Sequence, residues 1–250
     1  MKKNTKKKLL SVMLIIALLA IAVVGGTLAW FTDEDEVTNT FTVGSIEIKQ
    51  NEVFNEDTAN LMPVVGTEPN NADDNYIQKK VTVSNTGKNP AYIQTIVAVP
   101  TILDESNVLK LWDNNHKAYG WSKLDGDNST DNGAQAYLSG IPVDINGTEV
   151  DYNLYYYRYN TPLAPGDTTG ACLEYVYINA MADMNTYGTD GNGTTGTGYF
   201  VMNGEEIEGF NAFSKLDILV LTQAVQAEGF PDAATALTQA FGTDAPNFSA

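Results

Sequence analysis

The chain has 250 residues, 43% of them hydrophobic, and its 14 lysines and arginines face 31 acidic residues, giving a formal net charge of −17. This share of apolar residues is enough for a packed core and argues against wholesale disorder. The strong negative charge repels phosphate backbones and anionic lipid headgroups, so neither nucleic acid nor a membrane surface is an expected partner.

The first 29 residues have the pattern of an export signal. Five lysines within the first eight residues precede an apolar run, Leu9–Val24, which at 16 residues is short for a helix that crosses about 30 Å of hydrocarbon. Thr27 and Ala29 place small residues where a signal peptidase reads them, which predicts cleavage between Ala29 and Trp30. The alternative is an uncleaved anchor. The short run and the small residues both argue against it.

Residues 30–250 are predicted to form one all-β domain. Cleavage removes five cations and no acids, which leaves this part with a net charge of −22. β-Branched residues that alternate with other types predict a first strand from about Asn39 to Gln50. The preceding residues, 30–41, form an N-terminal extension, and residues 52–75 lack periodicity and predict an irregular loop.

The next two predicted strands flank a turn. Residues 77–83 alternate between apolar and polar, residues 85–90 carry turn chemistry, and residues 91–99 resume the apolar pattern. This arrangement predicts an antiparallel pair of strands across the turn.

The central region is harder to interpret until its tyrosine-rich segment. Within residues 104–148, Leu109–Trp112 fits a short strand or helix, and Trp121 fits a packing anchor. Asp151–Tyr159 then predicts a strand, because it holds four tyrosines within its last five residues and aromatic residues suit a pleated, half-buried surface. The tyrosines are interpreted as a sheet face, and sugar binding by them is the alternative.

Residues 171–178 alternate as another strand. Its faces are predicted to carry Leu173, Tyr175 and Tyr177 on one side and Cys172, Val176 and Ile178 on the other. Residues 216–225 are apolar on both faces and are predicted to be a strand in the middle of a sheet or between two sheets, with a buried helix as the alternative.

A short helix is predicted near the C-terminus. Asp232 is a suitable N-cap and Gly242 a suitable stop. Between them, Ala233, Leu237 and Phe241 are expected to be buried.

Catalytic residues are scarce. Cys172 is the only cysteine and lies in an apolar run, so it can form no internal disulfide and is interpreted as a buried structural thiol. His116 is the only histidine, whereas a zinc peptidase needs two or three such ligands and a serine hydrolase needs a histidine base. The chain is therefore not expected to be an enzyme.

Two loops have compositions that suggest a bound ligand, calcium in one and phosphate in the other. Asp125, Asp127 and Asp131 lie in a stretch rich in carboxylate and amide oxygens, which suit calcium, but the spacing is not that of an EF-hand. A solvated acidic loop is the alternative, and no other cofactor is indicated. The glycine-rich residues 187–198 lack the lysine of a phosphate-binding loop and are interpreted as flexible.

Four sequence blocks resemble the TasA/camelysin family. These are GTLAWFTD with NTFTVGSIEI (residues 26–33 and 39–48), VTVSNTG with PAYI (81–87 and 90–93), YY with PLAPGDTT (156–157 and 162–169), and AVQAEGF with DA and Ala236 (224–230, 232–233 and 236). The blocks stand in the family's order. At one position the chain departs from the pattern, because Gln94 stands where the family often has an arginine.

The resemblance implies a jelly-roll-like antiparallel β-sandwich with short helices and long loops. It also implies export from a Gram-positive cell through a SipW-type signal peptidase, and a structural role in extracellular fibres of the biofilm matrix. In TasA-like fibres the processed N-terminus of one copy is the strand that joins the next copy's sheet. In this chain that donor strand would be residues 30–41, with Trp30, Phe31, Val37 and Phe41 as its apolar contacts.

The expected partners are therefore other copies of the chain, with accessory matrix or anchoring proteins and the signal peptidase, and the membrane only before cleavage. The rival functions are a secreted adhesive or glycan-binding module and the metallopeptidase activity described for camelysin-like relatives. The C-terminal residues carry no sortase signal, so attachment to the cell wall is not expected.

Overall fold

The computed structural model describes residues 45–54, 62–65, 68–69, 75–124, 136–186, 198–211 and 217–248. All of them belong to one compact unit. In this part of the chain no helix is long and apolar enough to cross a membrane. The predicted cleavage site at Ala29 and Trp30, the extension 30–41 and the calcium candidates Asp125, Asp127 and Asp131 lie outside the described residues.

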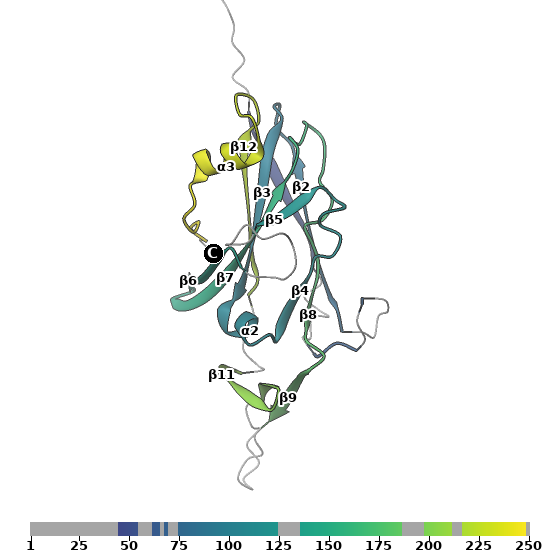
Figure 1. The fold of residues 1–250 in the computed structure, drawn as a ribbon, viewed down its shortest axis with the longest axis vertical. Coiled ribbons are helices and arrows are strands. Elements are labelled where there is room, and N and C mark those ends of the chain that lie inside the picture. The colour runs from purple at the N-terminus through teal and green to yellow at the C-terminus, as the bar shows by residue number, and fades with distance from the viewer. Residues whose placement is uncertain are drawn as a thin grey trace, which may run out of the picture. The chain divides into compact units, whose positions relative to one another are not determined.

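The described residues form two larger antiparallel sheets and one small sheet (Figure 1). The first sheet has the order β1 (Ile48–Phe54), β2 (Ile77–Asn85), β8 (Leu173–Ile178) and β4 (Leu109–Trp112). The second has the order β12 (Leu219–Gln226), β3 (Ala91–Pro100), β7 (Thr148–Tyr159) and β5 (Trp121–Leu124), and β6 (Leu138–Ile145) also pairs with β7. The predicted all-β sandwich is thus confirmed.

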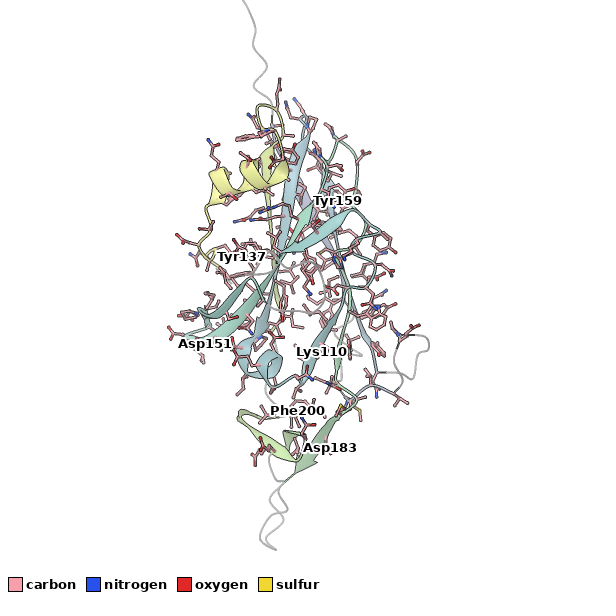
Figure 2. The ribbon with its side chains drawn as sticks, in the orientation of Figure 1. Lys110, Tyr137, Asp151, Tyr159, Asp183 and Phe200 are labelled. Carbon is pink, nitrogen blue, oxygen red and sulfur yellow. The ribbon has the colours of Figure 1, made fainter. Side chains whose placement is uncertain are left out.

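Three shorter strands and two helices complete the described part. β9 (Ala182–Thr186), β10 (Gly198–Met202) and β11 (Glu205–Asn211) form the small sheet, and Phe200 of β10 joins the core of the sandwich (Figure 2). α2 (Thr101–Glu105) follows β3, and α3 (Ala233–Phe241) follows β12.

The main core lies between the two larger sheets. β2 alternates buried and more exposed residues as predicted, whereas every residue of β3 is buried. The odd-numbered Ile93, Val97 and Val99 of β3 join the main core. The even-numbered Ile96 and Ala98 belong to a second apolar cluster with Leu154 and Tyr156 of β7. The second sheet therefore buries apolar side chains on both faces, which explains the continuous apolar runs of β3 and β7.

The predicted C-terminal helix is confirmed, with its caps and two of its three expected buried residues. The Asp232 side chain accepts a hydrogen bond from the Thr235 backbone N–H at 2.8 Å, and Gly242 follows the helix with φ of 76°. Ala233 and Leu237 are buried against Tyr92 of β3. Phe241 remains 39% exposed, so its predicted burial is wrong.

Two predictions about strand position are also wrong. β1 begins at Ile48 and ends at Phe54, so it shares residues 48–50 with the strand predicted over residues 39–50 and extends into the predicted loop. Residues 45–47 are not in a strand, and residues 39–44 lie outside the described residues. β12 is a strand, as predicted, but it lies at the edge of its sheet and is half-buried along most of its length. Apolar residues of β12 pack against apolar clusters on both faces of the sheet. A strand at the edge of a sheet can be covered on both faces in this way, so its apolar pattern does not require a neighbouring strand on each side.

The predicted pairing of the strands that flank residues 85–90 is wrong as well. β2 pairs with β1 and β8 in the first sheet, whereas β3 pairs with β12 and β7 in the second. The turn therefore crosses from one layer of the sandwich to the other. The alternation of β8 is also only partly as predicted, because Leu173 is fully buried in the main core together with Cys172, Val176 and Ile178.

Candidate assembly site

Described residues from each of the four sequence blocks come together in one network of hydrogen bonds. We call this network the motif junction, and it comprises residues 45–47 before β1, 85–91 from the end of β2 to the start of β3, 163–169 before β8, and Ala227 after β12. Within it, the Glu47 carbonyl accepts hydrogen bonds from the backbone N–H groups of Thr86 (2.9 Å) and Gly87 (3.0 Å). The Ser45 carbonyl accepts one from Lys88 at 2.9 Å. The segment that leads into β1 is thus tied to the turn between the sheets.

Asn85 is the central residue of the motif junction. Its side chain is fully buried, and its amide nitrogen donates to the carbonyls of Asn89 (2.9 Å) and Leu163 (2.8 Å). Its side-chain oxygen accepts from the Gly87 backbone N–H at 3.0 Å. A buried amide with these three bonds fixes the turn, because each partner would otherwise lose a hydrogen bond inside the protein.

Backbone bonds connect the remaining blocks. Ala91 and Leu163 exchange two backbone hydrogen bonds of 3.1 and 2.8 Å, and the Ala227 N–H donates to the Pro90 carbonyl at 2.9 Å. Gly87 lets the segments approach closely, because a Cβ at this position would lie 2.6 Å from both the Glu47 nitrogen and the Ser45 oxygen. The junction therefore joins both sheets to the chain that precedes β1.

One side of the sandwich has open strand edges. β1 and β12 each end their sheet, and within the described residues no strand pairs with the outer edge of either. We call these two edges the open edge. Gln50 of β1 connects them: its side-chain oxygen accepts from the Thr222 hydroxyl at 2.6 Å, and its nitrogen lies 3.4 Å from the Val220 carbonyl.

The far end of β1 exposes apolar side chains. Val53 is 53% exposed and Phe54 is 42% exposed, and Lys79 lies over the Phe54 ring at 5.2 Å. Lys79 also forms an ion pair with Glu52 at 2.8 Å. An unpaired edge with apolar residues beside it is the kind of surface that accepts a strand from another chain.

A polar network inside the sandwich stabilises the layers without forming a reactive centre. Asp113 accepts hydrogen bonds from the Lys123 amine (2.8 Å) and the Tyr157 hydroxyl (2.6 Å). The Tyr155 hydroxyl donates to Asp104 at 2.7 Å, and the Lys123 amine lies 4.7 Å from the centre of the Tyr155 ring. Burial, reinforced by Asp113, raises the pKa of Tyr157 well above its usual range. The sequence analysis did not predict this network, because Tyr157 and Tyr155 lie 44 and 51 residues along the chain from their carboxylate partners.

The only cysteine and the only histidine of the chain lie in surroundings that do not suit catalysis. Cys172 is fully buried, and burial raises the pKa of its thiol to about 12, so it stays protonated at neutral pH. The His116 Nδ1 lies 2.6 Å from the Asp113 carbonyl oxygen, and its ring packs edge-on against Tyr157. The interpretation of Cys172 as a structural thiol is confirmed.

The other predicted features have clear positions. Tyr155, Tyr156 and Tyr157 are buried, and Tyr159 is half-buried with its ring centre 5.1 Å from that of Trp121, so the tyrosine-rich strand is a sheet face, as interpreted. Trp121 is fully buried and donates to the Gly170 carbonyl at 2.9 Å, as a packing anchor should. Gln94, in place of the family's arginine, donates to the Gln223 side chain at 2.7 Å across β3 and β12.

Metal binding has no built site in the described part of the chain. No group of three or more histidine, cysteine, aspartate or glutamate side chains is placed there to hold an ion. The loop with the three calcium candidates lies outside these residues, so that interpretation stays a prediction.

Comparison with known protein families supports the resemblance. Residues 4–95 match the family described as camelysin metallo-endopeptidase, the family that includes TasA. No curated protein matches the chain. The match includes most of the predicted signal peptide, β1, the turn with Asn85 and Gly87, and the first part of β3. Residues 4–95 are thus similar to this family, in agreement with the resemblance that the sequence blocks predicted.

Proposed function

We propose that the protein is a secreted structural subunit of extracellular fibres in a biofilm matrix. After removal of residues 1–29, the extension 30–41 of one copy pairs with the open edge of the next. The family match links the chain to biofilm matrix proteins at the level of the family. The fibre and its mode of assembly are our proposal.

The open edge is the observation that carries the proposal. An edge strand presents a row of backbone N–H and C=O groups, and a strand from another chain satisfies them. Natural proteins usually cover or interrupt such edges. In the described residues the side chain of Gln50 forms hydrogen bonds between β1 and β12, which a competing strand can replace.

The motif junction supports the proposal that the same extension joins each copy to the next. Ser45 and Glu47 are bonded to the turn after β2, which fixes the position of the segment that follows the extension. An extension that starts from a fixed point presents the same geometry to every neighbour. This is what a repeating fibre requires, since a heterologous contact that does not close propagates into a filament.

The charge of the extension suggests control of assembly. Residues 33–36 are four consecutive acids, which are poor strand formers and repel one another. Protons or divalent cations reduce this repulsion, and salt screens it. Fibre growth is therefore expected to increase at lower pH or with added calcium, and growth that is indifferent to both would contradict this part of the proposal.

Electron microscopy of the processed protein tests the proposal. The intact protein should form filaments, and a variant that lacks residues 30–41 should remain monomeric. A matched control replaces residues 30–41 with a Gly/Ser segment of equal length, which keeps the chain length but supplies no apolar contacts. Filaments from the truncated variant, or none from the intact protein, would overturn the proposal.

Peptidase activity is the competing function, because the matched family is named for it. We propose that this chain is not a peptidase. A catalytic zinc site uses three protein ligands, mostly histidines, and His116 is the only histidine and is buried between Asp113 and Tyr157. Incubation of the purified protein with casein and added zinc should give no cleavage above that of a His116→Gln variant.

A further inference from the structure

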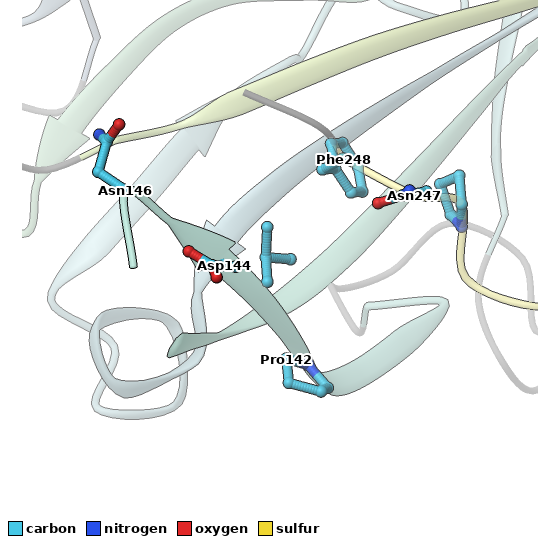
Figure 3. A pocket seen from close by; sticks show the side chains of 7 residues that line it. Pro142, Asp144, Asn146, Asn247 and Phe248 are labelled. Atoms are coloured by element: carbon cyan, nitrogen blue, oxygen red, sulfur yellow. The ribbon is translucent and has the colours of Figure 1, made fainter. Parts of the chain in front are cut away.

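A pocket lies between β6 and the C-terminal residues, on the side of the second sheet away from the main core (Figure 3). Its volume is about 380 Å³, which lies in the range of small-molecule sites. Pro142, Asp144 and Asn146 form one wall, and Asn247 and Phe248 form the other. The open edge of β1 and β12 does not contribute to it.

Both walls are held in place by bonds and packing of their own. Asn146 and Gly147 form the tight turn between β6 and β7 with φ of 53° and 85°, and the Gly147 N–H donates to Asp144 at 2.6 Å. Opposite them, Ala245 and Phe248 pack against the apolar cluster on the outer face of the second sheet. The turn and the Phe248 ring are therefore held by contacts within the chain, which lowers the entropic cost of binding.

The lining defines the chemical class of ligand. Asp144 is the only ionisable residue among the lining side chains, and neither lysine nor arginine is present, so phosphates and other anions are excluded. One carboxylate is too few for calcium, which takes six to eight oxygen ligands. Asp144 offers acceptors, while Asn146 and Asn247 offer both donors and acceptors. Phe248 and Pro142 add flat apolar surfaces.

We propose that this pocket binds a neutral pyranose. A sugar ring has adjacent hydroxyl groups that suit the carboxylate and amide side chains, and an apolar C–H face that suits the Phe248 ring. The binding site is separate from the open edge, so the protein would attach polysaccharide whether or not it forms fibres.

Saturation-transfer NMR and titration of the processed protein with neutral, amino and uronic acid oligosaccharides test the proposal. A neutral oligosaccharide should bind, and uronic acid oligosaccharides should not. Tighter binding of the oligosaccharide than of its monosaccharide would identify a polysaccharide as the source, and equal binding would identify the free sugar. Absence of binding by every neutral sugar would overturn the proposal.

Two substitutions locate the site. Phe248→Leu keeps apolar volume against the sheet but removes the ring, and Asp144→Asn keeps the oxygen that accepts from Gly147 but removes the charge. Each should weaken binding by roughly tenfold, the effect of one good contact. Asp151→Asn, an exposed change on the paired strand β7 outside the pocket, should leave binding unchanged. Binding that survives both pocket substitutions would contradict the assignment.

Discussion

At the scale of single residues, the largely buried ion pair of Asp113 and Lys123 gives a direct test of what stabilises the sandwich. Both side chains are only 14% exposed. Lys123→Met should lower the free energy of unfolding by about 3–5 kcal/mol, because it leaves the Asp113 carboxylate buried without its cation. Urea unfolding followed by circular dichroism measures the change.

Lys80→Met is the matched control, since Lys80 is exposed on β2. It should change the free energy of unfolding by no more than about 0.5 kcal/mol. Equal effects of the two substitutions would show that the Asp113–Lys123 pair adds nothing to stability.

The buried tyrosines and the thiol predict a loss of stability in alkali. Burial raises the pKa of Tyr152 and Tyr156 to about 12 from 10.0, and that of Cys172 to about 12 from 9.0. The unfolded chain releases these protons at lower pH than the folded chain, so their contribution is complete below pH 9 and declines as pH rises toward 12.

Urea midpoints measured at pH 8, 10 and 11 should therefore fall in that order. Absorbance at 295 nm should show that part of the tyrosines stays protonated at pH 11 in the folded protein and ionises on unfolding. Equal midpoints at pH 8 and pH 11 would contradict the prediction.

At the scale of elements, the turn from β2 to β3 links the two layers and holds the segment before β1. Gly87→Ala places a methyl group 2.6 Å from backbone atoms of both Glu47 and Ser45, so these segments must separate. The expected cost is roughly 1–3 kcal/mol of unfolding free energy. Amide hydrogen exchange should increase at Thr86, Gly87 and Lys88, whose N–H groups bond to that segment.

Thr86→Ala, at an exposed neighbouring position, should leave exchange at Gly87 and Lys88 unchanged. If Gly87→Ala exchanges like the unmodified protein, the motif junction does not hold the segment before β1.

The sequence predicted the type of several elements better than their partners. Alternation in β2 and the caps of α3 are local signals, and the structure confirms both. Alternation tells which face of a strand is buried but not which strand lies beside it. This is why the pairing of β2 with β3 and the central position of β12 were predicted wrongly.

Local signals for two hairpins were present but not used. Asn146-Gly147 and Asn203-Gly204 both form tight turns with positive φ, between β6 and β7 and between β10 and β11. Asn-Gly between extended segments is a strong hairpin signal. The weak apolar alternation of β6 and β11 concealed these strands.

The candidate site could be predicted only in part. The sequence blocks contain Asn85, Gly87 and Leu163, but nothing in their spacing shows that Asn85 bonds to a carbonyl 78 residues away. Contacts over such separations depend on how the sheets stack. The network around Asp113 and the pocket beside Phe248 were missed for the same reason.

At the scale of the whole molecule, the proposed fibre requires the transfer of residues 30–41 to a neighbouring copy. A negatively charged chain without disulfides would gain stability outside the cell from such assembly, because each added strand satisfies backbone groups that water would otherwise solvate. The sandwich supplies the open edge and the motif junction supplies a fixed origin for the extension.

Cysteine cross-linking between two singly substituted copies tests this transfer most directly. Cys172 is buried and its thiol stays protonated, so any disulfide that forms will join the introduced cysteines. A Val37→Cys copy mixed with a Leu221→Cys or Thr222→Cys copy should form a disulfide-linked dimer during fibre growth. If neither mixture gives a dimer, and a single chain that carries both cysteines forms an internal disulfide instead, the extension pairs with its own sandwich and the proposal is contradicted.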